Sequence, residues 1–107
     1  MAKRRYNITA IITDKRGRPL SIANNDYKKS HPMMRQLGEA VGEPYKIALH
    51  AEVSAILRCH DLSKAHKISI YRYDKDGNPR LAKPCAVCMR AINLSGIPNV
   101  EWTTNEM

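Results

Sequence analysis

The sequence predicts an α/β fold in which helices flank a mixed central sheet of four or five strands. Three observations support this prediction. Apolar residues alternate through residues 5–13, as in a strand with one buried face. A β-rich run at 66–73 then lies between two stretches of helical spacing, 50–60 and 85–95. A hairpin followed by alternating helix and strand is typical of a sheet covered by helices.

The first half of the chain predicts a hairpin and then a long connection. Residues 14–19 have turn chemistry, and Leu20, Ile22 and Ala23 continue as a second strand that pairs with the first. Residues 24–46 are polar and broken by glycine and proline, so we expect a loop there, with one short helix near 33–41.

The second half carries both predicted helices. Val53, Ile56 and Leu57 have the i, i+3, i+4 spacing of an apolar helix face. After the strand at 66–73, Asp, Gly, Asn and Pro at 74–79 predict a turn.

The second helix, 85–95, precedes Gly96, a residue type that commonly ends helices. Residues 97–99 then connect to a last predicted strand, Val100 to Thr104.

Length and composition bound the class of protein. With 107 residues, we expect one small domain spanning 1–107. Three cysteines, an odd number, and no secretory segment favour a reducing cytoplasm over a disulfide scaffold. No apolar run approaches the length of a membrane span, so we expect no membrane partner.

The net charge of +8 is unevenly distributed along the chain. Ten of the eighteen Lys and Arg residues lie in 1–46, against four acidic residues. This asymmetry favours anionic partners such as nucleotide phosphates or nucleic acid, although solubility alone is an alternative. The basic turn at 15–18 is open to the same two interpretations, a nucleic-acid contact or a solvated turn.

The most informative residues are one histidine, two cysteines and a glutamate. His50 opens the first predicted helix, and Cys85 and Cys88 open the second, three positions apart on one face. One imidazole and two thiolates with a fourth position open form the ligand set of a catalytic zinc site. Glu52, two residues after His50, is placed to handle protons beside the metal rather than to ligate it.

Other interpretations of these residues stay open. A Cys-x-x-Cys pair alone also suits a thioredoxin-like redox motif, although redox chemistry has no need of Glu52. A structural zinc needs a fourth protein ligand, which His31, Cys59, His60 or His66 would have to supply. We interpret Cys59 as a small hydrophobic residue, and His60 and His66 as structural.

The motifs His50-Ala51-Glu52 and Pro84-Cys85-x-x-Cys88 resemble those of the zinc-dependent cytidine and deoxycytidylate deaminase superfamily. The segment 25–32, Asn-Asp-Tyr-Lys-Lys-Ser-His-Pro, is also similar to one in its small phage-type members. This resemblance implies a three-layer sandwich, bound Zn²⁺ and hydrolytic deamination of a cytosine ring, with Glu52 as both base and acid.

The resemblance also implies substrate contacts. It places Asn25 against the sugar hydroxyl, with the adjacent Asn24 as the alternative, and the backbone amide of Ala51 against the base. Tyr27 and Pro84 are further candidates to line the substrate.

The resemblance further implies a cytosine nucleotide or nucleoside, such as deoxycytidylate, as the substrate, and relatives of this kind usually form homo-oligomers. Single-stranded DNA or RNA is the alternative substrate. A zinc-stabilised nucleic-acid-binding module without turnover is the alternative outside enzymes.

Overall fold

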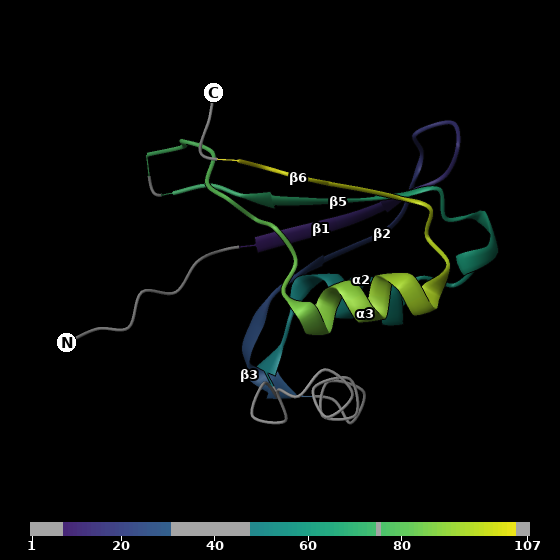
Figure 1. The fold of residues 1–107 in the computed structure, drawn as a ribbon, viewed down its shortest axis with the longest axis horizontal. Helices are drawn as coiled ribbons and strands as arrows, with labels where there is room; N and C mark the ends of the chain where they lie inside the picture. Colours follow the sequence, from purple (N-terminus) through teal and green to yellow (C-terminus); the bar gives the residue numbers. More distant parts are fainter. Residues whose placement is uncertain (1–7, 31–47, 75, 105–107) are drawn as a thin grey trace.

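The structure is a computed structural model that describes residues 8–30, 48–74 and 76–104; the side chains of 26–30 and 48–49 are not included in that description. A four-stranded mixed sheet is its centre, with the strand order β2-β1-β5-β6 (Figure 1). Its strands are β1 (Ile8–Thr13), β2 (Pro19–Asn24), β5 (Lys67–Arg72) and β6 (Asn99–Trp102). The sheet and its helices confirm the predicted α/β sandwich.

Strand β1 lies between its hairpin partner β2 and the distant strand β5, antiparallel to both. Ala10 pairs with Ala23 on one side and with Ile70 on the other. β6 runs parallel to β5, and a parallel pair needs a long crossover connection. The helix α3 (Ala86–Ser95) supplies that crossover.

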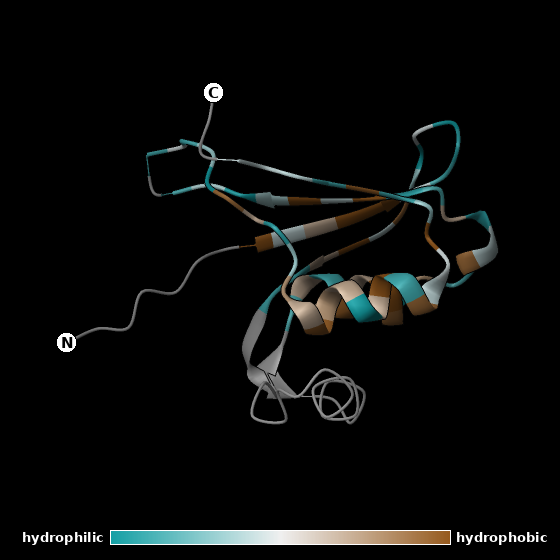
Figure 2. Cartoon of the chain, viewed as in Figure 1, coloured by the Kyte–Doolittle hydropathy of each residue, from teal (hydrophilic) through white to brown (hydrophobic). Residues whose placement is uncertain are grey.

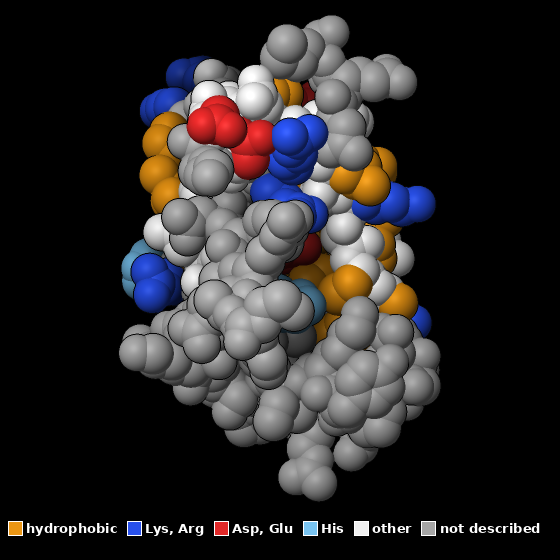
Figure 3. All heavy atoms as spheres, turned by 90° about the vertical axis from the view of Figure 1, so that its left-hand side faces the viewer, with side chains coloured by type: hydrophobic (Ala, Val, Ile, Leu, Met, Phe, Trp, Pro, Cys, Tyr) orange, Lys and Arg blue, Asp and Glu red, His pale blue; other side chains and the backbone are white. Residues whose placement is uncertain are grey.

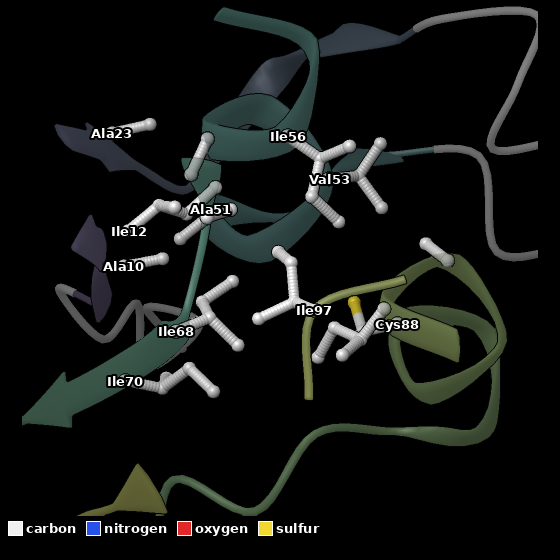
Figure 4. Close-up of a cluster of buried hydrophobic side chains, with 14 of the residues drawn as sticks. Ala10, Ile12, Ala23, Ala51, Val53, Ile56, Ile68, Ile70, Cys88 and Ile97 are labelled. Atoms are coloured by element: carbon white, nitrogen blue, oxygen red, sulfur yellow. The ribbon is translucent and has the colours of Figure 1, made fainter. Parts of the chain in front are cut away.

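Helices α2 (Ala51–Arg58) and α3 lie on the same face of the sheet (Figure 1). Buried residues at alternate strand positions and buried residues of both helices form one core, and hydrophobic and polar residues alternate along these elements (Figure 2). Ser21 fixes α2 on β2, because its hydroxyl donates a 2.7 Å hydrogen bond to the Ala55 carbonyl. The core between these layers is mostly aliphatic, and Figure 4 shows part of it, including Ile12, Ile68 and Val53. Its largest fully buried side chains are Ile12, Ile68, Ile70, Ile92, Val53, Val87 and Cys88.

A second, two-stranded sheet leads into the helix α2. It pairs β3 (Asp26–Ser30) with β4 (Ala48–Leu49), antiparallel, with a register shift between Asp26 and Ser30. The prediction of a loop through 24–46 is therefore wrong for Asp26–Ser30. The sequence Asp-Tyr-Lys-Lys-Ser lacks apolar alternation, and pairing with β4 satisfies its backbone instead. The predicted helix near 33–41 lies outside the described residues.

The other predicted elements are present with shifted ends. α2 ends at Arg58, before the predicted 60, and Leu57 is 40% exposed rather than part of the buried helix face. α3 ends at Gly96, whose φ of 80° is the left-handed conformation that glycine adopts readily. A short 3₁₀ helix, η1 (Leu62–Lys64), follows α2. No helix in the described part of the chain is both long and apolar enough to cross a membrane.

Candidate metal centre

The site forms where the N-termini of α2 and α3 meet. His50 is the N-cap residue of α2 and Cys85 that of α3, and both have extended backbone conformations. Neither side chain makes the usual hydrogen bond to its own helix. Both side chains are directed instead into the space between the two helices, where Cys88 from the first turn of α3 joins them.

The three side chains bring their ligand atoms close together. His50 Nδ1 lies 3.2 Å from Cys88 Sγ and 3.6 Å from Cys85 Sγ, and all three ligand atoms lie within 4.8 Å of one another. Ideal tetrahedral zinc, with its usual bond lengths, separates nitrogen and sulfur ligands by roughly 3.5 Å and two sulfurs by roughly 3.8 Å. The predicted ligands are thus arranged as a zinc site.

No fourth protein ligand joins this cluster among the described residues. Cys59 is half-buried against the core at the end of α2, and His60 is exposed beyond it. His66 lies beside Asn99, with its Nε2 3.3 Å from the Asn99 Nδ2. His31 lies outside the described residues. Within the part of the chain that the structure describes, the cluster therefore offers three ligands, the number that proteins supply in catalytic zinc sites.

The two thiols differ in their protonation. The thiol of Cys88 donates a hydrogen bond to Cys85 and, with help from His50, lowers the pKa of Cys85 to about 3. The same hydrogen bond, followed by burial, raises the pKa of Cys88. The opposite shifts make Cys85 the more readily ionised of the two thiols, and zinc would require both cysteines as thiolates.

Glu52 lies beside the ligands in the first turn of α2 and is only 5% exposed. Burial raises the pKa of its carboxyl group, and this effect exceeds the opposing effects of backbone hydrogen bonding, His50 and the Cys88 thiol. The raised pKa makes this buried carboxyl easier to protonate, which suits a group that must both accept and donate a proton. At this end of the molecule, a histidine and an acidic side chain are recessed among hydrophobic side chains (Figure 3).

Three of the four predicted substrate contacts can be located. Ala51 is buried at the start of α2, where backbone N–H groups have no acceptor within the helix. Pro84 is buried directly before Cys85. Asn25 is half-buried at the end of β2. Its side-chain oxygen accepts a 3.0 Å hydrogen bond from the Ile8 N–H.

The remaining candidates are less informative. Asn24, the alternative to Asn25, is exposed, and its side-chain oxygen accepts a 2.7 Å hydrogen bond from the Thr9 hydroxyl. The backbone of Tyr27 lies on β3, and its side chain is outside the description.

The sequence did not indicate the supports of the segment that leads to Cys85. Arg72, at the end of β5, donates a 3.1 Å hydrogen bond from Nη1 to the carbonyl of Leu81. The hydroxyl of Thr103 accepts from the Arg72 N–H and donates to the Arg80 carbonyl. These contacts join residues 9 to 31 positions apart, so local spacing carries no signal of them.

Comparison with known proteins agrees with this geometry. The family model described as the cytidine and deoxycytidylate deaminase zinc-binding region matches residues 1–104. No curated protein matches the chain.

Proposed function

Because the chain belongs to the family of the cytidine and deoxycytidylate deaminase zinc-binding region, we propose that it deaminates a free cytosine nucleotide or nucleoside, such as deoxycytidylate. The reaction consumes water and releases ammonia and the uracil form. The observation that carries this proposal is the position of buried Glu52 beside the three convergent ligand atoms.

In this proposal His50, Cys85 and Cys88 would hold zinc, which would supply an activated water by lowering its pKa toward neutrality. The helix N-termini favour the charge of the two thiolates. Three protein ligands would be one fewer than a structural zinc site uses.

Glu52 moves the protons of the reaction. It accepts a proton from the attacking water and delivers it to the ring nitrogen, while oxygen bonds to the carbon that carries the exocyclic amine. Glu52 then takes the remaining proton from the new hydroxyl group and delivers it to the amine. The carbon–oxygen bond becomes a carbonyl as the carbon–nitrogen bond breaks, and ammonia leaves. The raised pKa of Glu52 supports both roles, since one group must be a base and then an acid in the same cycle.

Residues around the metal orient the substrate. The N–H of Ala51 contacts the base, Asn25 contacts the sugar hydroxyl, and Pro84 and Tyr27 line the substrate. The two hydrogen bonds between Asn25 and Ile8 support this role, because they hold the asparagine at the edge of the sheet.

The charge of the chain favours a second candidate substrate, cytosine in single-stranded nucleic acid. Affinity for a strand falls steeply with salt, because each neutralised phosphate releases counterions, whereas affinity for a mononucleotide does not. Salt dependence therefore separates the two substrates.

The test is ammonia release by the zinc-loaded protein. Deoxycytidylate, deoxycytidine, deoxycytidine triphosphate and a cytosine-containing single strand are each assayed at two salt concentrations, with metal content measured on the same sample. We expect turnover of the free nucleotide or nucleoside with little salt dependence. Fully zinc-loaded protein that releases ammonia from none of the four would contradict the proposed activity and favour a zinc-stabilised binding module.

A further inference from the structure

A basic pocket of about 480 Å³ lies apart from the zinc ligands. Three segments distant in sequence line it: the hairpin turn at 14–18, the segment 63–66 after α2, and Gly96 with Pro98 after α3. The first two carry its charged side chains. Together they contribute four cationic side chains, Lys15, Arg16, Arg18 and Lys64.

The basic pocket and the zinc ligands lie at opposite ends of the helices. Cys85 begins α3, and Gly96, which ends it, lines the pocket. A helix of this length spans roughly 15 Å. The hairpin turn and η1 lie together at the end of the molecule away from the N-termini of α2 and α3 (Figure 1). The basic pocket is therefore distinct from the metal centre.

The cations of the pocket are little neutralised by the protein. The one lining carboxylate, Asp14, is engaged in its own turn. It accepts hydrogen bonds of 2.9 Å from the N–H groups of Arg16 and Arg18, and one of 3.1 Å from Arg18 Nε. Within 8–30, 48–74 and 76–104, the ion pairs do not involve Lys15, Arg16 or Lys64.

Two weaker negative features lie nearby. The carboxylate of Asp61 caps η1 by accepting from the Ser63 N–H, and its interaction with Lys64 is electrostatic only. The C-terminal end of α3 adds a partial negative charge of about half an electron, which is small against the three cations Lys15, Arg16 and Lys64. The pocket therefore keeps a strong preference for anions.

The residues that line the pocket also determine whether it can contact the bases or only the phosphates of a nucleic acid. It contains no Phe, Tyr or Trp on which a base could stack. The ring of His66 is directed to Asn99. The Ser63 hydroxyl donates to the Asp61 carboxylate. The remaining donors are flexible cations, which suit phosphate oxygens rather than base edges.

We propose that the basic pocket is a second binding site, which holds the phosphate backbone of single-stranded nucleic acid without reading its sequence. Cations from two separate segments can contact successive phosphates of one strand. This inference does not depend on the deaminase activity, because it concerns binding at the far end of the molecule.

The test measures binding of a fluorescent oligothymidylate, which contains no cytosine, to the zinc-loaded protein over a range of salt concentrations. The double variant Lys15→Ser with Lys64→Ser removes two cations of the pocket. The double variant Lys83→Ser with Arg90→Ser is the control. It removes two exposed cations outside the pocket, so its net charge equals that of the pocket variant. All four side chains are exposed, so both variants are expected to fold.

We expect the pocket variant to bind more weakly and to lower the slope of log affinity against log salt by about 1.4, since each single-strand phosphate contact contributes about 0.7. The control variant should keep the wild-type slope. Equal losses in both variants, or no loss in the pocket variant, would overturn the proposal. Displacement of the strand by thymidine monophosphate at the same phosphate concentration would also overturn the proposal, because the pocket would then bind free phosphates rather than a strand.

Discussion

The two helices of the metal centre begin alike and differ in what surrounds them. Each starts at an extended N-cap residue that points its side chain at the site, His50 for α2 and Cys85 for α3. In α2 the six residues Ala51–Ile56 are all buried. In α3 only four of ten residues are buried, on one side, and Cys85 itself is half-exposed.

This difference in burial separates two tasks. Glu52, the carboxyl proposed to move protons, lies on the enclosed helix, where loss of water raises its pKa. The thiols lie on the more exposed helix, where Cys88 points from α3 toward α2 (Figure 4). We infer that α2 provides the proton chemistry and one ligand, whereas α3 provides most of the metal binding.

The largest expected effect comes from Glu52→Gln, which keeps the shape of the side chain and removes its ability to exchange a proton. General acid–base catalysis contributes roughly 10²- to 10⁴-fold, so we expect a loss of ammonia release in that range or beyond. Zinc content should be unchanged, as measured by metal analysis. The control is Glu101→Gln on the exposed strand β6, which should retain full activity. A fully active Glu52→Gln variant would contradict the inference that α2 provides the proton chemistry.

Zinc binding can be tested by comparing Cys85→Ser with Cys88→Ser. Both variants should lose most of the zinc, because each removes one of three ligands. In the presence of a chelator they should differ. Serine is a favoured N-cap residue. The unfolding free energy of zinc-free Cys85→Ser should therefore be at least that of the zinc-free wild type, and higher by up to about 0.5–1 kcal/mol. Cys88→Ser buries a hydroxyl in the core and should cost about 1–3 kcal/mol.

Denaturant unfolding of the three zinc-free proteins measures these differences. If the two variants were equally stable without zinc, the two cysteines would not differ in their structural roles. If either retained full zinc, its place among the ligands would be wrong.

Sequence spacing was sufficient for the ligands and for the starts of both helices. His50, Cys85 and Cys88 are each next to, or within, the first turn of a helix with clear apolar spacing, so local pattern placed them. Non-local features had no such signal. β3 is held by pairing with β4, and the Leu81 carbonyl by Arg72, across the sheet. Neither the strand pairing nor the hydrogen bond depends on residues that are adjacent in sequence, so neither could be predicted from local patterns.

The ends of the two helices also differ, and this predicts a smaller effect. α3 ends at Gly96 with a φ of 80°, whereas α2 ends at Cys59 with an extended backbone. An added Cβ at Gly96 meets nothing within 4 Å, so only backbone strain opposes it. Gly96→Ala should lower the unfolding free energy by about 1–2 kcal/mol. Gly96→Asn should cost less, since asparagine tolerates this conformation better. Thermal unfolding of the two variants measures the difference, and equal costs would contradict this explanation.

The smallest effect is expected where α2 is fixed to the sheet. The buried Ser21 hydroxyl donates to the Ala55 carbonyl at 2.7 Å, a bond from a strand to the middle of the helix. Ser21→Ala should cost about 0.5–1.5 kcal/mol of unfolding free energy, the usual net value of one hydrogen bond. Ser95→Ala is the matched control, because the Ser95 hydroxyl donates to Ile92 within α3 itself. If Ser21 helps to hold Glu52 in place, activity should fall in Ser21→Ala and not in Ser95→Ala. A stability loss without any change in turnover would show that α2 keeps its position through core packing alone.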